Sequence, residues 1–211
     1  MNRMILVAIL FMVTKSVFSM TIDPDPRIIV SFMDKTISPE LDILRVMAGI
    51  SSDNNHLIFE VKTRGERLQG SKRDYLLLHI THGKTYVLLL PINKEKENQV
   101  IVYERLSQSN GDDHASPILG RFIRNSSLMN FNITPISQGG EFSIPLDWID
   151  FNTNLSFDAY TVQAKVKGNT LEIDKVYDWA RKGRTHINKE SLSAITLLNK
   201  ICTPTSNKQR F

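Results

Sequence analysis

DYLLLHITHGKTYVLLLPI, residues 74–92, contains two apolar runs of strand length on either side of the tripeptide His-Gly-Lys. Leu, Val, Ile and Tyr dominate both runs, and short continuous apolar runs of this kind are typical of strands that are buried on both faces. Gly83 can adopt a positive φ angle without steric cost, so three residues are enough to reverse the chain. The stretch predicts a hairpin of two adjacent, deeply buried strands at 74–81 and 84–92.

Strand-like alternation of apolar and polar residues continues on both sides of this hairpin. In HLIFEVKT, residues 56–63, the apolar face consists of Leu57, Phe59 and Val61. AYTVQAKV, residues 159–166, alternates most regularly, and its inward face consists of Tyr160, Val162, Ala164 and Val166. Further strands are expected at 27–33, 42–50, 98–105, 141–146 and 170–176.

These segments give about nine strands, and no helical pattern of ten or more residues separates them, which disfavours a parallel βαβ architecture. We therefore predict an all-β fold, an antiparallel two-sheet β-sandwich. The segment 106–140 interrupts the rhythm, with a short helix expected near 117–123. A short amphipathic helix is predicted close to the C-terminus, with Asn188 as its cap, Pro204 as its stop, and an apolar face made of Leu192, Ile195 and Leu198.

Residues 1–19 have the composition of a secretory signal peptide, with Arg3 followed by the apolar run 4–13 and a small-residue pattern at Val17 and Ser19. The run is shorter than the roughly 20 residues of a spanning helix, so no stable membrane span is expected. We predict an exported, extracytoplasmic protein, periplasmic or secreted, with a sandwich domain at 20–180 and a basic helix and tail at 181–211.

The charge is unevenly distributed along this mature chain. Loss of Arg3 and Lys15 lowers the formal charge from +4 to +2, and residues 181–211 alone carry +6. Such a tail can dock on an anionic partner or a membrane surface, or it can be a solvated end. No nucleic-acid partner is expected, because the basic residues are not interleaved with aromatic residues. Cys202 is the only cysteine, so no internal disulfide can hold the fold.

No local signature of catalysis or of a metal site is present. Cys202 lies in a polar terminal stretch without a neighbouring base motif, and His79 and His82 lack further ligands nearby. We therefore expect a protein that is not an enzyme and has no catalytic residues, no metal and no cofactor.

DFNTNLSFD, residues 150–158, places Asp, Asn or Ser at every second position, as a calcium loop does. An EF-hand loop that began at Asp150 would need glycine at its sixth position and glutamate at its twelfth, and the chain has Leu155 and Thr161 there. The stretch is better interpreted as a connection into a strand. We expect Phe151, Leu155 and Phe157 to face the sandwich and the Asp and Asn residues to face water.

The two tryptophans, Trp148 and Trp179, both follow predicted strands. An aromatic ring outside the core face can stack on a sugar, but a large ring at a strand end can also plug the edge of the sandwich. Both interpretations remain open.

The order of four sequence segments resembles extracytoplasmic β-sandwich domains grouped as DOMON-like or family 9 carbohydrate-binding-module-like. These segments are LDILRVMAGISSDNNHLIFEVKTRG, DYLLLHIT, EFSIPLDWIDFNTNLSFDAYTVQ and LEIDKVYDW, within about residues 27–180. The similar features are a strand opening with Asp-Ile, a strand of the form Leu-x-Phe-x-Val-x-Thr (57–63) and a late Ile-Pro-Leu strand.

The resemblance implies a ligand-binding or assembly module. Sugar-binding members clamp a terminal sugar between aromatic rings, which makes Trp148 and Trp179 the candidate ligand-binding residues. Haem-binding members use a methionine and a histidine as axial ligands. No motif here selects a pair from Met47, Met129, His56 and His79, so haem is not expected.

Two functions follow from these observations, and a third interpretation, a hydrolase with catalytic residues dispersed along the chain, stays open because active sites assemble in space. The first is a non-catalytic carbohydrate-binding module whose partner is a glycan outside the cytoplasm. The alternative is a structural or accessory subunit of a cell-envelope assembly, such as a secretion machine, whose partner is an envelope protein.

Overall fold

The computed structural model describes residues 27–67, 71–95, 100–105, 118–127, 130–182 and 192–202. Its strands form two sheets in which every pairing is antiparallel. The five-stranded sheet has the order β1 (Ile28–Val30), β2 (Ile43–Ile50), β3 (His56–Thr63), β9 (Gly139–Pro145), β8 (Asn132–Ile136). The seven-stranded sheet has the order β11 (Thr170–Trp179), β7 (Gly120–Arg124), β6 (Val102–Arg105), β5 (Lys84–Pro91), β4 (Asp74–His82), β10 (Asn154–Lys167), β12 (Leu192–Ser193).

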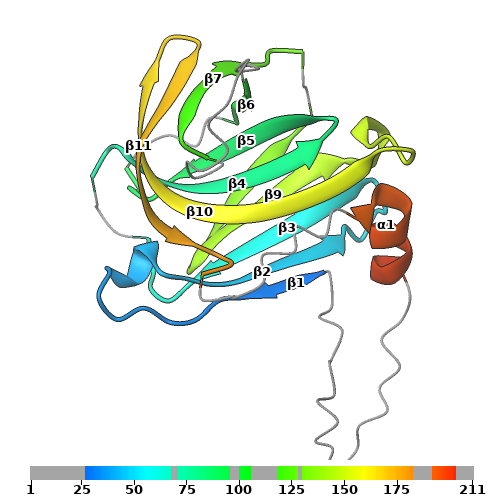
Figure 1. Ribbon diagram of the computed structural model, residues 1–211. Coiled ribbons are helices and arrows are strands. Elements are labelled where there is room, and N and C mark those ends of the chain that lie inside the picture. The colour runs from blue at the N-terminus through cyan, green and yellow to red at the C-terminus, as the bar shows by residue number, and fades with distance from the viewer. Residues whose placement is uncertain are drawn as a thin grey trace, which may run out of the picture.

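The all-β antiparallel sandwich predicted from the sequence is confirmed, with one short C-terminal helix, α1 (Ala194–Cys202), at one end of the sheets (Figure 1). Twelve strands are present in the described residues instead of about nine. The three additional strands are short, and β12 has only two residues. Two 3-10 helices complete the described elements, η1 (Pro39–Leu41) and η2 (Leu146–Trp148).

The predicted hairpin at 74–92 is confirmed. β4 and β5 pair from Tyr75 opposite Pro91 to His82 opposite Lys84, and Gly83 turns the chain at a φ of 67°. Most residues of both strands are buried, because each face of the hairpin covers a different core.

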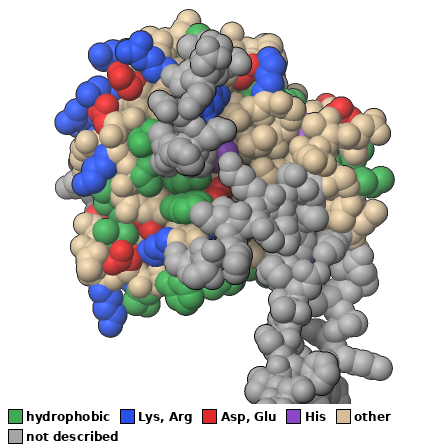
Figure 2. Space-filling model, viewed as in Figure 1, with side chains coloured by type: hydrophobic (Ala, Val, Ile, Leu, Met, Phe, Trp, Pro, Cys, Tyr) green, Lys and Arg blue, Asp and Glu red, His purple; other side chains and the backbone are tan. Residues whose placement is uncertain are grey.

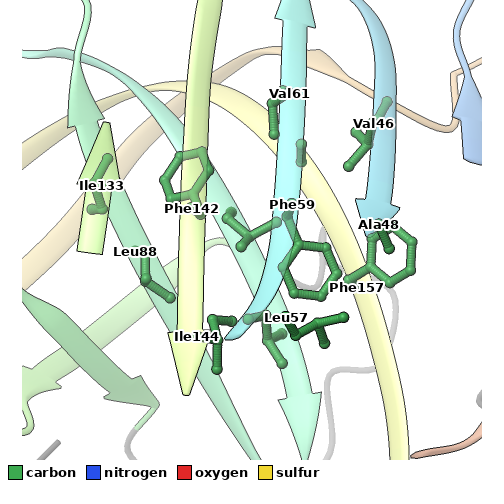
Figure 3. Close-up of a cluster of buried hydrophobic side chains, with 14 of the residues drawn as sticks. Val46, Ala48, Leu57, Phe59, Val61, Leu88, Ile133, Phe142, Ile144 and Phe157 are labelled. Carbon is green, nitrogen blue, oxygen red and sulfur yellow. The ribbon is translucent and has the colours of Figure 1, made fainter. Parts of the chain in front are cut away.

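The first core, which we call the sandwich core, lies between the two sheets (Figure 3). Phe59 and Phe142 come from neighbouring strands of the five-stranded sheet, and Phe157 of β10 packs against Phe59 with ring centroids 4.8 Å apart. Gly139 allows the close approach of β9 to β3, since it has a φ of 114° and a Cβ atom there would collide with the carbonyl oxygen of Val61.

The seven-stranded sheet also closes on itself, because β11 pairs with both β7 and β10 (Figure 1). One row of directly paired residues runs once around this ring of six strands, in the order Phe157, Ile80, Tyr86, Glu104, Ile123, Thr170, Lys167. The row starts and ends on β10, ten residues apart, so the strands are strongly staggered as in other closed sheets.

The ring encloses a second core, which we call the ring core. Its buried members are Tyr75, Leu77, Val87, Leu89, Tyr103, Ile118, Phe122, Tyr160, Val162, Ala164, Leu171 and Ile173. Tyr160, Val162 and Ala164, which the alternation in 159–166 predicts to face inward, therefore point into the ring and not between the sheets. Val166, which the alternation also predicts to be inward, is 40% exposed near the end of β10.

Two helix predictions need correction. The segment 117–123 was expected to contain a helix, but Gly120–Arg124 is β7, since its backbone pairs with β6 and β11. In α1, Leu197 and Leu198 are buried whereas Ile195 is 52% exposed, so Ile195 is not part of the packed face. Leu192 belongs to β12, and Asn188 and Pro204 lie outside the described residues. No helix of the described part of the chain has the length and apolar content needed to span a membrane.

Candidate functional site

Polar side chains gather at one end of the ring, on the face that points inward. Asp158 of β10 is directly opposite His79 of β4, and Ser156 is opposite Thr81. Alternate residues of a strand share a face, so these four side chains form a square beside the apolar ring core. Trp179 at the end of β11 and Arg181 just beyond it complete this group, which we call the polar end of the ring.

Asp158 is the central group of the polar end, and it is only 7% exposed. Its Oδ1 accepts a hydrogen bond from the backbone N–H of Ala159 at 2.9 Å. Its Oδ2 accepts the indole Nε1–H of Trp179 at 2.6 Å and faces Nε of Arg181 at 3.2 Å. Burial raises the pKa of Asp158 to about 6, because the loss of water outweighs the stabilisation of the carboxylate by Trp179 and Arg181.

Trp179 is half-buried, and contacts on two sides fix its ring. Its plane lies parallel to the ring of Tyr160, with an interplanar angle of 2° and centroids 6.1 Å apart. The hydrogen bond to Asp158 fixes rotation within that plane. Tyr160 is itself buried in the ring core, where burial and the charge of Asp158 raise the pKa of its hydroxyl. The ring of His79 meets Tyr160 edge-on at 6.0 Å.

Arg181 connects the polar end to the backbone of β10. Its Nη2 donates to the carbonyl oxygen of Phe157 at 3.2 Å while its Nε faces Asp158. Its side chain is 19% exposed, so the guanidinium lies largely within the protein.

Residues 178–182, which we call the strap, are also held on the other side of the sheet. Asp178 accepts the backbone N–H of Ile43 at 2.7 Å, and Lys182 bridges Asp178 at 2.9 Å and Asp42 at 3.0 Å. Asp42 is fully buried and also pairs with Arg64 at 2.7 Å. The strap is therefore fastened to the start of β2 independently of Asp158.

Trp148 lies in a different environment. Its ring is 5.1 Å from His82, 5.2 Å from Tyr86 and 5.3 Å from Phe131 between ring centroids, and it packs against the sandwich core. Trp179 packs against the ring core instead. The two tryptophans thus belong to separate clusters, and the structure does not bring them together as two sides of one clamp.

The two histidines of the hairpin also separate. His79 and His82 are three residues apart on one strand, so their side chains project from opposite faces. His82 accepts the backbone N–H of Asp150 at its Nε2 (2.8 Å), and its Nδ1 lies 3.3 Å from the carbonyl oxygen of Asn154. His82 thereby anchors the 150–154 connection. Among the described residues, no group of three or more His, Cys, Asp or Glu side chains is suited to a metal ion.

The expectations for DFNTNLSFD are met in part. Leu155 and Phe157 are buried, and the carboxylate of Asp150 accepts local hydrogen bonds from the backbone N–H of Asn152 (2.9 Å) and the hydroxyl of Thr153 (2.7 Å). Two expectations were wrong. Phe151 is 47% exposed because it lies in the turn before β10, and Asp158 faces the ring and not water.

The sequence contained a signal for Asp158 that its polarity obscured. Asp158 lies two residues before Tyr160 and four before Val162, so the alternation along β10 already places its side chain on the same inward face. The sequence contains no such signal for Arg181 and Lys182. Both belong to the basic segment 181–211, and its net charge does not show that each of them pairs with a buried carboxylate.

Comparison with known proteins finds no matching family model, no matching curated protein and no matching solved structure.

Proposed function

We propose that this protein is a non-catalytic, extracytoplasmic binding module that takes a carbohydrate at the polar end of the ring, with Trp179 as its stacking platform. The observation that carries the proposal is the fixed, half-buried indole of Trp179 beside Asp158 and Arg181. An aromatic face provides a flat apolar surface for the C–H groups of a sugar, and neighbouring polar side chains hydrogen-bond to its hydroxyl groups.

Preorganisation supports this assignment. A ring that is already held by Tyr160 and Asp158 loses little conformational freedom when a ligand stacks on it, so less of the binding free energy is lost to ordering. The hydroxyls of Thr81 and Ser156 and the imidazole of His79 lie on the same face of β4 and β10 and supply further hydrogen-bonding groups. Trp148, which packs among three other rings, is the second candidate for a stacking residue.

The test uses the fact that the chain has two tryptophans. A glycan array identifies a binding sugar, and fluorescence titrations then compare the variants Trp148→Phe and Trp179→Phe. We expect the sugar to shift the emission of the Trp148→Phe chain, in which Trp179 is the remaining fluorophore, and to bind Trp179→Phe at least tenfold more weakly. A blank array, or unchanged affinity in Trp179→Phe, contradicts the assignment.

A second function, an accessory subunit of a cell-envelope assembly, is favoured by a different surface. Hydrophobic side chains reach the surface at the lower edge of the molecule in Figure 2, where β1 and β2 lie in Figure 1. Val30, Phe32 and Met33 are each more than half exposed in this region. Surface apolar groups next to an edge strand are a common means of protein–protein contact.

Affinity purification from envelope extracts tests this second function, with the double variant Phe32→Ser, Met33→Ser as the matched control. A partner that is retained by the original chain and lost by the variant supports an assembly role. Recovery of the protein alone from both chains contradicts it.

A further inference from the structure

We propose that Asp158 is the positioning residue of the carbohydrate site, holding the plane of Trp179 through its ionised carboxylate and releasing that ring when it takes up a proton. This inference rests on the proposed function, which it extends to the regulation of the same site. It makes ligand affinity depend on pH through one carboxyl group.

The hydrogen-bond pattern around Asp158 favours the ionised form. Its three partners, the Ala159 N–H, the Trp179 Nε1–H and the Arg181 guanidinium, are all donors. A protonated carboxyl carries a hydrogen on one oxygen and needs an acceptor there. Protonation of either oxygen removes the negative charge that strengthens the contacts from Trp179 and Arg181, and protonation of Oδ2 also places a hydrogen where both donors point.

The groups around Asp158 define its electrostatic surroundings. Arg181 is the cation that faces it from the strap, His79 is opposite on β4, and the Tyr160 hydroxyl lies on its own strand. Burial raises the pKa of Asp158 to about 6, and Arg181 acts in the opposite direction. The carboxyl therefore changes its charge within the pH range that an extracytoplasmic protein meets.

Loss of the proton-sensitive contact loosens Trp179 without detaching the strap. The strap keeps its second attachment, through Lys182 to Asp42 and Asp178 and through the Ala180 N–H to the Ala159 carbonyl oxygen at 3.0 Å. Protonation of Asp158 thus acts on the orientation of one side chain. If only protein with ionised Asp158 binds the sugar, about a tenth of the molecules can bind at a pH about one unit below this pKa. The apparent affinity for the sugar then falls about tenfold.

The first experiment needs no ligand. In the Trp148→Phe background, Trp179 is the only tryptophan. This variant also removes the indole that lies beside the imidazole of His82, so His82 cannot affect the measured emission through Trp148. The emission of Trp179 and its quenching by acrylamide are followed from pH 4.5 to 8. We expect one transition with a midpoint near 6, no transition with Asp158→Asn, and a midpoint at higher pH with Arg181→Gln, because the guanidinium favours the charged carboxylate.

His79 provides the matched control, because it lies opposite Asp158 on β4 and an imidazole can also take up a proton in this pH range. The transition should persist in His79→Gln. A transition that disappears in His79→Gln and persists in Asp158→Asn assigns the titration to the histidine and overturns the inference, as does a flat profile in the parent. Circular dichroism checks that each variant is folded, and Arg181→Gln keeps the inference testable where Asp158→Asn does not fold.

The second experiment measures the affinity for the sugar from the array at pH 7.5 and pH 5.0. We expect about tenfold weaker binding at pH 5.0 in the parent and equal affinities in Asp158→Asn. The two failures are distinguishable: a blank array contradicts the carbohydrate function alone, while a pH-independent affinity or emission overturns the role of Asp158 even where sugar binds.

Discussion

The ammonium group of Lys182 lies 3.0 Å from Oδ1 of Asp42, a completely buried carboxylate 140 residues earlier in the chain. The same ammonium contacts Asp178 at 2.9 Å, and Asp178 in turn accepts the N–H of Ile43. One lysine therefore joins the end of β11 in the ring to the start of β2 in the other sheet. This junction fixes the position of the strap that carries Trp179.

Replacing Lys182 with Met should destabilise the fold strongly, because Asp42 and Asp178 would then share a buried region in which, among the described residues, Arg64 is the one cation left in contact with Asp42. Removing one partner of a buried ion pair costs on the order of 3 kcal/mol in the free energy of unfolding. Urea unfolding measures the loss. Lys167→Met, at an exposed position on β10, is the control and should stay within about 0.5 kcal/mol of the parent. Equal stabilities of the two variants would show that the junction contributes little.

The stability of the fold should depend on pH through Asp158. Its pKa is about 6 in the folded protein against 3.8 for the ordinary group, so the folded state binds the proton more tightly. Proton binding by Asp158 therefore stabilises the folded state fully below about pH 4, and this stabilisation is lost as the pH rises through 6. The loss is about 3 kcal/mol, because the two pKa values differ by about two units. Unfolding of the parent and of Asp158→Asn is compared from pH 4 to 7. The stability of the Asn variant relative to that of the parent should rise with pH by this amount, and a difference that stays constant rules out the effect.

Gly139→Ala should weaken the contact between β9 and β3, since the backbone has a φ of 114° and the new Cβ would meet the Val61 carbonyl. Strain of this kind costs roughly 1–3 kcal/mol, and the backbone shift adds to it. Thermal and urea unfolding check the loss. Gly49→Ala is the matched control, because a Cβ at Gly49 has open space around it. A loss as large at Gly49 as at Gly139 contradicts the steric explanation.

The helix α1 should depend on Leu197 and not on Ile195. Leu197 is 1% exposed and packs in the sandwich core, so Leu197→Ala should lower the unfolding free energy by about 2–4 kcal/mol. Ile195→Ala, at a side chain that is 52% exposed, should change it by about 0.5 kcal/mol or less. A larger loss for Ile195→Ala than for Leu197→Ala would contradict this assignment and support the packed face predicted from the sequence, which includes Ile195.

Nearly all of the long strands could be predicted from the sequence, because the alternation of apolar residues and the turn at Gly83 are local properties of the chain. β3 begins and ends where HLIFEVKT does. The short strands β7, β8 and β12 could not be predicted, since they have too few residues to establish a period, and their pairing with distant strands defines them.

The sequence by itself determined that the protein is an antiparallel β-sandwich and which faces of its long strands are apolar. Only the tertiary structure decided what covers each face. Alternation distinguishes two sides of a strand, but it does not say whether a side faces the other sheet or the inside of a closed ring. The candidate site depends on that difference, because Asp158, Trp179 and Arg181 meet only when β11 returns to pair with β10. A buried carboxylate acquires its role from such distant partners, which no local pattern contains.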